Sequence, residues 1–363
     1  MTPPAETQTA SSPARLDGLR REAQRSLFRA RNGIKVLAGT GRPEVGASPK
    51  EVVWRRGKAR LLRYDSDKRT RRPPLVIVFS IVSRAYILDL RPGHSFIEQL
   101  IDAGFDVFLL DWGEADAVDS GNDFELYVDN YMPRALDRAL EVAEADEVDV
   151  LGYCFGGVLS LLAAAGHPEI PIRNLGVMAT PIDLTAVEGV IKALERGQLE
   201  VDDVLDETGN VPAAAVYRGF ASLRPSADVF KYATLWERLW DDKFVEGYQA
   251  MAGWIGDQVP LPGAIAREMA ELMLRRNLLA SGEFPVGGRT IRLADISCPL
   301  LNVMAANDHM VPPHASEGLG DLVSSDDVTS VQIPAGHIGL VAGRDAARIT
   351  LPRIMEWLNQ RSS

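Results

Sequence analysis

One cysteine lies in a short stretch that is rich in glycine. Cys154 is the centre of LGYCFGGVLS (151–160), where Gly152, Gly156 and Gly157 surround it in a G-x-C-x-G-G frame. An apolar run precedes this frame and a helical pattern follows it, so the cysteine is expected at a sharp turn between a buried strand and a helix. Such a turn exposes a nucleophile at the carboxyl edge of a sheet, and the positive end of the following helix favours the thiolate. A small buried structural cysteine is the alternative, and the complete frame argues against it.

A nucleophile of this kind needs a base and a group that orients the base. Asp308 follows the apolar run LLNVMAAND (301–308), and His337 follows TSVQIPA (329–335). Their order along the chain, nucleophile then acid then histidine, is the order of this strand–turn–helix arrangement. We therefore expect His337 to take the proton of Cys154 and Asp308 to hold the imidazole ring.

Other candidates for these roles are less suitably placed. His309 adjoins Asp308, so its side chain is expected to point away from a shared hydrogen bond. Asp111 and Asp183 also follow strands and are interpreted as structural, as is Cys298. The oxyanion that forms during attack needs two donors, which we expect to be the backbone N–H of Phe155 and one N–H near Val82, after the strand 74–81.

The elements that must position these residues alternate along the chain. Strands are predicted in a hairpin (51–64) and at 74–81, 106–112, 147–153, 174–180, 301–308 and 329–335, with helices near 94–103, 123–143 and 155–166. This alternation indicates an α/β fold with a mostly parallel sheet covered on both faces. Between Pro181 and Ser297 it stops, and the pattern becomes mainly helical with turns at 209–212, 223–226, 259–263 and 283–288. We expect a core of 51–180 and 298–363, and a cap or lid insertion of 181–297.

The N-terminal region differs from this core. Residues 1–14 are expected to be disordered, and 15–50 to form a basic amphipathic helix and a linker. The helix carries an apolar stripe, and we favour its packing on its own domain over its binding to an anionic surface or a partner. The stripe consists of Leu16, Leu19, Ala23, Leu27, Ala30, Ile34 and Leu37.

Bulk composition excludes several classes of protein. The chain has 363 residues, 46% of them hydrophobic, and a net charge of −11, which argues against nucleic-acid binding. Two cysteines give no disulfide framework, and no cluster of Cys and His has the spacing of a zinc site, so neither a metal nor a cofactor is expected. No apolar run is long enough to cross a bilayer and the N-terminus lacks the pattern of a signal peptide, so a cytoplasmic location is expected.

From about residue 50 to 360 the sequence resembles the polyhydroxyalkanoate synthases, α/β-hydrolase-fold enzymes that polymerise (R)-3-hydroxyacyl-CoA into storage polyester. The likeness is carried by IVSRAYILDL (81–90), GFDVFLLDWG (104–113), GYCFGG (152–157), GN-P (209–212), W-x-x-D (254–257), NDHMVPP (307–313) and AGHIGL (335–340). Ser83 departs from the asparagine that is frequent in the family.

The resemblance implies Cys154 as acyl carrier, His337 as its base and Asp308 as the third member of the triad, with either of the last two activating the substrate hydroxyl. It is strongest to the two-subunit (class III) type, which implies a second synthase subunit, a polyester granule surface and, as a further option, a homodimer. A thioester substrate would explain the thiol, because transfer to Cys154 keeps the acyl group activated for an alcohol acceptor. Two other interpretations stay open: a hydrolase of thioesters or small esters with the same triad, and a granule-associated structural protein, which the intact triad disfavours.

Overall fold

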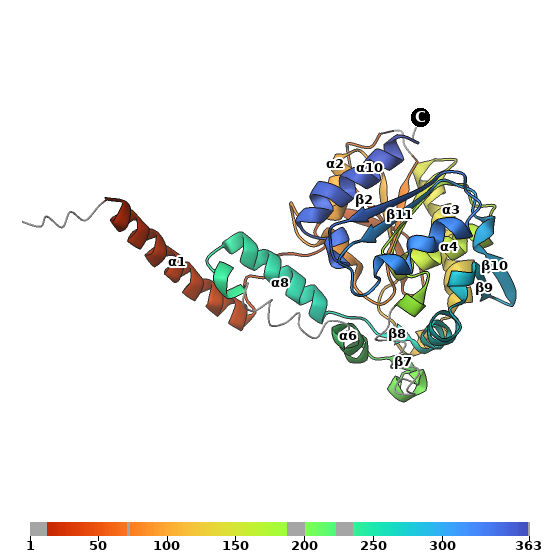
Figure 1. Cartoon of the computed structure of the whole chain (residues 1–363), viewed down its shortest axis with the longest axis horizontal. Coiled ribbons are helices and arrows are strands. Elements are labelled where there is room, and N and C mark those ends of the chain that lie inside the picture. The colour runs from red at the N-terminus through yellow and green to blue at the C-terminus, as the bar shows by residue number, and fades with distance from the viewer. Residues whose placement is uncertain (1–12, 71–72, 187–199, 223–234, 362–363) are drawn as a thin grey trace, which may run out of the picture. The chain divides into compact units, whose positions relative to one another are not determined.

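The computed structural model describes residues 13–70, 73–186, 200–222 and 235–361. The chain forms two compact units (Figure 1). The smaller unit comprises Met1–Pro43 with Pro225–Gly253, and the larger comprises Glu44–Arg224 with Trp254–Ser363. The N-terminal segment predicted to be disordered falls, up to residue 12, outside the described residues.

An eight-stranded sheet forms the centre of the larger unit, in the order β1-β2-β4-β3-β5-β6-β11-β12. β1 pairs with β2 and β2 with β4 in antiparallel fashion, and all other neighbours are parallel. The mostly parallel α/β sheet predicted from the sequence, including its first hairpin, is therefore confirmed. The strands are β1 (Lys50–Arg56), β2 (Ala59–Tyr64), β3 (Leu75–Val78), β4 (Val107–Asp111), β5 (Val148–Tyr153), β6 (Ile172–Met178), β11 (Leu300–Ala305) and β12 (Val328–Ile333).

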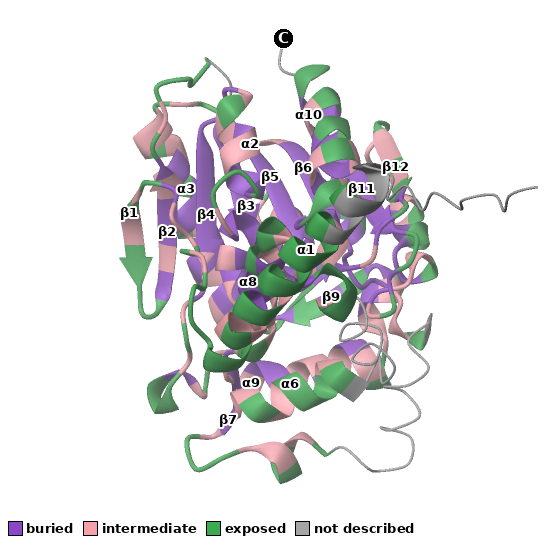
Figure 2. Cartoon of the chain, turned by 90° about the vertical axis from the view of Figure 1, so that its left-hand side faces the viewer, coloured by how far each residue is buried: buried purple, intermediate pink, exposed green. Residues whose placement is uncertain are grey.

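Helices cover both faces of this sheet (Figure 1). α2 (Phe96–Asp102) and α10 (Leu351–Asn359) contact each other on one face, while α3 (Met132–Ala143) and α4 (Phe155–Gly166) pack on the other. Every residue of β3 and of β5 is buried, as Figure 2 shows in purple for the central strands. Because both faces are covered, these strands are apolar at nearly every position rather than alternating. The exception is Asp149 of β5, which accepts a hydrogen bond from Nδ2 of Asn174 at 2.7 Å.

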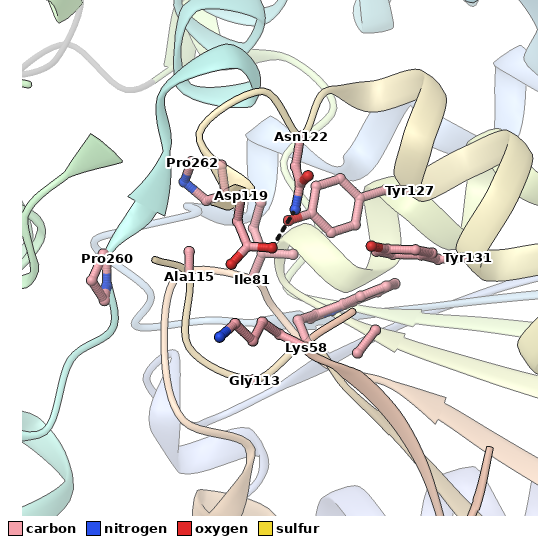
Figure 3. Close-up of a pocket in the computed structure, with 12 residues that line it drawn as sticks. Lys58, Ile81, Gly113, Ala115, Asp119, Asn122, Tyr127, Tyr131, Pro260 and Pro262 are labelled. Carbon is pink, nitrogen blue, oxygen red and sulfur yellow. Dashed lines mark hydrogen bonds between the residues drawn. The ribbon is translucent and has the colours of Figure 1, made fainter. Parts of the chain in front are cut away.

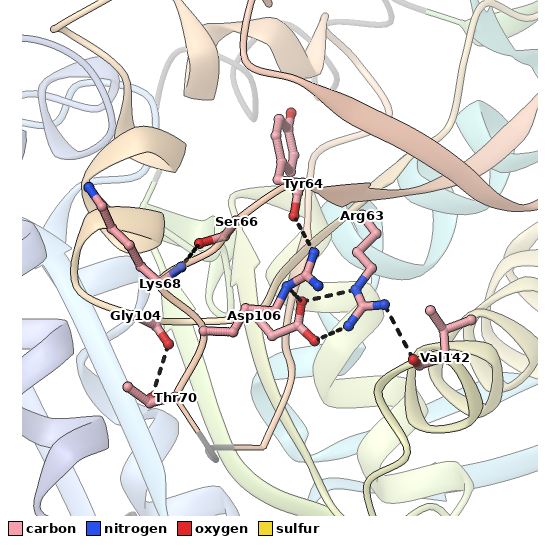
Figure 4. Close-up of polar contacts among 9 residues, drawn as sticks. Arg63, Tyr64, Ser66, Lys68, Thr70, Gly104, Asp106 and Val142 are labelled. Atoms are coloured by element: carbon pink, nitrogen blue, oxygen red, sulfur yellow. Dashed lines mark hydrogen bonds and ion pairs between the residues drawn. The ribbon is translucent and has the colours of Figure 1, made fainter.

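A cluster of charged side chains joins β2 to the start of β4 (Figure 4). Arg63 donates from Nε and Nη2 to the two oxygens of Asp106, at 3.1 and 2.7 Å, and Arg69 lies 3.1 Å from the same carboxylate. Arg63 also donates to the carbonyl of Val142 at the end of α3, at 3.3 Å. The buried carboxylate of Asp106 is thus compensated by two guanidinium groups, as a buried charge requires.

The insertion between β6 and β11 is mainly helical, as predicted, and its described elements include the α-helices α6 (Ala213–Ser222), α8 (Asp242–Gly256) and α9 (Gly263–Glu268). It also contains two short hairpins, β7 (Asn210–Val211) with β8 (Leu261–Pro262) and β9 (Glu283–Val286) with β10 (Arg289–Arg292). The interpretation of 283–288 as a turn was wrong for most of its length, because 283–286 form β9 and only the glycine pair that follows makes the turn. The predicted turn at 223–226 lies outside the described residues, and the limits of a lid at 181–297 stay a prediction.

The smaller unit packs α1 (Pro13–Ala38) against the segment that leads into α8. Asn32 is buried there and donates from Nδ2 to the carbonyl of Leu239 and to Asp242, at 2.8 Å each. The guanidinium of Arg25 lies 4.6 Å from the ring centroid of Trp240. The contact is therefore made by a polar side of the helix.

The apolar stripe of α1 lies elsewhere on the helix. Leu27, Ile34 and Leu37 are 73%, 68% and 90% exposed. Our expectation that this stripe packs on the helix's own domain was wrong for these residues, because hydrogen bonds and stacking through Asn32 and Arg25 determine which side of the helix is covered. None of the described helices is both long and apolar enough to span a bilayer.

Candidate active site

Cys154 lies at a sharp turn between β5 and α4. Its backbone has φ 55° and ψ −123°, a conformation that residues with a side chain rarely adopt. The turn is held by hydrogen bonds from the N–H of Cys154 to the carbonyl of Met178, at 2.8 Å, and from the N–H of Gly157 to the carbonyl of Cys154, at 2.9 Å. Strain of this kind persists only where the surroundings impose it, and it is frequent at functional sites.

The glycines of the frame are required by close packing around the turn. A Cβ added at Gly156 would lie 2.1 Å from the carbonyl oxygen of Val78, and one at Gly157 would lie 1.9 Å from Oγ1 of Thr180. A Cβ at Gly152 would lie 2.5 Å from Cα of Gly157. The first turn of α4 therefore runs directly against the ends of β3, β5 and β6.

His337 and Asp308 are brought together as the sequence predicted. Nδ1 of His337 lies 2.7 Å from Oδ2 of Asp308, and both side chains are buried. The other oxygen of Asp308 accepts the backbone N–H groups of Met310 and Val311, at 2.8 and 2.9 Å. The carboxylate is thus fixed on both oxygens, and it orients the imidazole ring so that Nε2 is left for a third group.

That third group is Cys154, whose side chain interacts with the His337 ring and contributes to its pKa. Burial lowers the pKa of His337, but the electrostatic interaction with Cys154 and the hydrogen bond to Asp308 outweigh it and raise the pKa to about 10. His309 and His314 are exposed. His337 is therefore the histidine that the fold places beside the cysteine.

Tyr153 is a part of the site that the sequence analysis missed. Its hydroxyl donates to the backbone carbonyl of His337 at 3.2 Å, and its ring centroid lies 5.2 Å from that of the imidazole. Phe79 stacks on the tyrosine ring, with ring centroids 5.6 Å apart. Burial, followed by the negative charges of Cys154 and Asp308, raises the pKa of Tyr153 well above its usual range, so it stays a neutral donor. Its position directly before the nucleophile was the only signal in the sequence.

The two expected oxyanion donors belong to elements that meet at this edge. Phe155 is the first residue of α4, and N–H groups in a first helical turn have no acceptor within the helix. Val82 lies in the loop after β3, the parallel neighbour of β5. The contact of its N–H within the described part of the chain is long, 3.5 Å to Oγ of Ser80. The role of these two groups stays a prediction.

The residues interpreted as structural have partners of their own. Asp111 pairs with Arg60 and accepts the N–H of Gly113 at 3.1 Å. Asp183 accepts the N–H of Thr185 and Nδ2 of Asn277, at 2.9 Å each. The thiol of Cys298 has its pKa raised by burial to about 11, which leaves it protonated and unreactive.

A small pocket lies beside the loops that follow β3 and β4 (Figure 3). Ile81 and Trp112 line it together with Asp119, which accepts a hydrogen bond from Asn122 at 3.5 Å. Its volume of about 20 Å³ holds about one water molecule. None of the three triad residues lines it, so we assign it no chemistry.

The geometry supports covalent acyl transfer. A thiol on a strained turn, an imidazole beside it and a carboxylate on the far ring nitrogen have the arrangement that a nucleophile, its base and an orienting group require, and these roles stay a prediction. The same arrangement serves transfer to water or to an alcohol, so it does not by itself select an acceptor.

Known proteins resemble the chain in sequence and in fold. A family model described as "alpha/beta hydrolase fold" matches residues 89–343. A protein of Haloferax mediterranei named "Poly(3-hydroxyalkanoate) polymerase subunit PhaC" is 35% identical over 88% of the chain, which spans only 65% of that protein. Proteins with the same name from Allochromatium vinosum and Synechocystis are 34% and 30% identical over 91% of the chain, which spans 93% and 90% of them.

Solved structures agree with the fold. Epoxide hydrolase A of Mycobacterium thermoresistibile superposes with a TM-score of 0.51 at 14% identity, covering 86% of the chain and 98% of the hydrolase. A thermophilic esterase of Thermogutta terrifontis superposes with a TM-score of 0.50 at 17% identity, covering 88% of the chain and all of the esterase. At these identities the likeness concerns the fold alone, and it agrees with the α/β-hydrolase fold expected from the sequence.

Proposed function

Since the chain belongs to the poly(3-hydroxyalkanoate) polymerase family and is an acyltransferase, we propose that it polymerises (R)-3-hydroxyacyl-CoA through a thioester on Cys154, with release of CoA. The observation that carries the proposal is the contact of Cys154, on its strained turn, with a His337 ring that Asp308 holds. 3-Hydroxybutyryl-CoA is the substrate with which to test it.

In the first half-reaction His337 takes the proton of the Cys154 thiol, and the sulfur attacks the thioester carbonyl. The tetrahedral intermediate carries its negative charge on the former carbonyl oxygen, which the N–H groups of Phe155 and Val82 stabilise. The intermediate then breaks its bond to the CoA sulfur, and CoA leaves with the proton from His337. One thioester has replaced another, so the acyl group stays activated.

In the second half-reaction the 3-hydroxyl of an acyl chain attacks the Cys154 thioester and an ester forms. The base for this hydroxyl is His337 rather than Asp308. Both oxygens of Asp308 are already engaged, one with two backbone N–H groups and one with His337, and its side chain is fully buried. The imidazole has lost its thiol partner in the acyl-enzyme, so its Nε2 is available to accept the hydroxyl proton.

The competing activity is hydrolysis, in which water takes the place of the hydroxyl. Incubation of the purified chain with 3-hydroxybutyryl-CoA distinguishes the two, because polymerisation gives insoluble polyester and hydrolysis gives free 3-hydroxybutyrate. Cys154→Ala should release no CoA, while Cys298→Ala, the matched change at the other cysteine, should release it at the normal rate. CoA release by Cys154→Ala, or free acid as the main product, would contradict the proposal.

A second subunit is part of this proposal, and the exposed stripe of α1 is the surface that supports it. Ala23, Leu27, Ala30, Ile34 and Leu37 are exposed, and they follow one another at steps of four, three, four and three residues. This 3.5-residue repeat is the narrow seam that packs against another helix, whereas a helix lying in a membrane surface has a wider apolar face.

Charge indicates what kind of helix covers the stripe. α1 carries seven basic and two acidic residues in a chain whose net charge is −11. Two copies of α1 would repel each other, so the helix fits an acidic amphipathic helix of a second synthase subunit better than a second copy of itself.

The double change Leu27→Glu with Ile34→Glu tests this surface. It should remove the acceleration of CoA release by the companion subunit and leave the slow activity of the isolated chain unchanged. Val118→Glu is the matched control, because Val118 is an exposed apolar residue outside α1. Unchanged acceleration in the double variant would reject the docking of the subunit on this stripe.

The proposal also includes a location: with its subunit bound, the enzyme works at the surface of polyester granules in the cytoplasm. Localisation of the tagged chain in polymer-producing cells tests this.

A further inference from the structure

The loop that follows β3 is held by a segment far away in the sequence. Nε1 of Trp254, whose side chain is almost completely buried, donates to the backbone carbonyl of Arg84 at 2.7 Å. Trp254 lies in the last turn of α8, 170 residues further along the chain. A hydrogen bond to a backbone carbonyl fixes the path of the loop itself and not only the position of a side chain.

Side chains add a second connection between the same two segments. Nε of Arg84 donates to Oδ1 of Asp257 at 3.1 Å, and the hydroxyl of Tyr86 donates to Oδ2 at 3.1 Å. Each oxygen of the Asp257 carboxylate is thus bonded to a different residue of the loop. Arg84 also donates from Nη2 to Glu114, at 2.7 Å.

This loop contains Val82, two residues before Arg84. We infer that Trp254 and Asp257 are positioning residues that hold the loop after β3 in the place where the N–H of Val82 stabilises the oxyanion. The inference rests on the proposed acyl transfer at Cys154. Oxyanion donors act only when they point at the position that the negative charge will occupy, so a small shift of the loop reduces catalysis strongly.

A merely structural role predicts something different. The side chains of Arg84 and Asp257 are 28% and 46% exposed, and ion pairs this accessible to water contribute little to folding stability. If the pair only stabilised the fold, its loss would change activity very little. If it positions the loop, its loss should slow acylation of Cys154 without unfolding the protein.

Two reactions of the same sulfur separate these roles. Acylation by 3-hydroxybutyryl-CoA passes through an oxyanion, whereas alkylation of Cys154 by iodoacetamide does not. In Asp257→Asn we expect the rate of CoA release at saturating substrate to fall about tenfold or more, while KM and the alkylation rate stay within about twofold of their normal values. The upper limit of this loss is about 10²–10³-fold, which is the cost of deleting one oxyanion donor. Asp257→Glu should recover part of the lost rate. Trp254→Phe, which keeps a ring but lacks the N–H, should show the same pattern.

Glu114→Gln is the matched control. It removes a carboxylate from the same guanidinium but leaves both bonds of Asp257 to the loop, so CoA release should stay within about threefold of normal. Normal CoA release by Asp257→Asn, an equal loss in Glu114→Gln, or a parallel loss of CoA release and alkylation would each overturn the inference. CoA release by Cys154→Ala would instead show that the proposed acyl transfer is wrong, so the two failures are distinguishable.

Discussion

The backbone strain at Cys154 leads to a prediction about stability. At φ 55° and ψ −123° a side chain costs about 1–3 kcal/mol, and glycine avoids this cost. Glycine also gives the unfolded chain more freedom, which costs about 0.4–1 kcal/mol relative to alanine. The alanine methyl is only partly buried at this site, so its contacts contribute less than about 0.8 kcal/mol. Cys154→Gly should therefore be more stable than Cys154→Ala by about 1 kcal/mol.

Urea unfolding of the two variants measures this difference, since both lack the thiol and any effect of the triad cancels. Cys298 provides the control. It is the other cysteine and is not among the described residues with positive φ, so Cys298→Gly should be less stable than Cys298→Ala by about 0.5–1 kcal/mol. The sign of the glycine–alanine difference should thus reverse between the two positions.

A Cys154→Gly variant no more stable than Cys154→Ala would show that the turn is not strained. The same result at both cysteines would show that the effect belongs to glycine in general and not to this turn. Either outcome would refute the reasoning that the surrounding glycines and strands force the nucleophile into its conformation.

Three further predictions concern the same edge of the sheet. The pKa of His337 is raised from its usual value of about 6.5 to about 10, so its contribution to folding stability is complete below about pH 6.5 and is lost as the pH rises toward 10. Between these two pH values the free energy of unfolding should fall more steeply in the wild type than in His337→Gln. Gly156→Ala should leave almost no folded protein in expression and circular dichroism measurements, because the added Cβ would meet the carbonyl oxygen of Val78 and the backbone cannot move aside. Ala179→Gly should raise the urea midpoint, because Ala179 has φ 46°.

The fold and the hydrogen bond between Asp308 and His337 could be predicted because their signals are local. Strands buried on both faces are continuous apolar runs, and parallel strands place the residues that follow them at one edge. Cys154 and Asp308 follow strands that are buried throughout, and His337 follows the partly exposed edge strand β12, so their approach required only the order of the strands.

Other features depend on contacts that no local pattern encodes. The bond between Arg84 and Asp257 joins residues 173 positions apart. The stripe of α1 was visible, but an amphipathic pattern indicates which side of a helix is apolar and not which side is covered. Asn32, one polar residue with two good hydrogen bonds, decides that contact. The β9 strand was missed because Pro285 and the glycine pair after it are typical of turns.

The hydrogen bonds of Asp308 determine what its replacement would do. In Asp308→Asn the amide oxygen would remain with the backbone N–H groups of Met310 and Val311, because these are donors and require an acceptor. The amide NH₂ would then face Nδ1 of His337 and donate to it, so the ring would carry its proton on Nε2, beside Cys154. This tautomer cannot take the proton of the thiol. A comparable change in a serine triad costs about 10⁴-fold, and we expect CoA release to fall by about the same factor while the fold persists. A loss of less than about tenfold would show that Asp308 does not set the tautomer of His337.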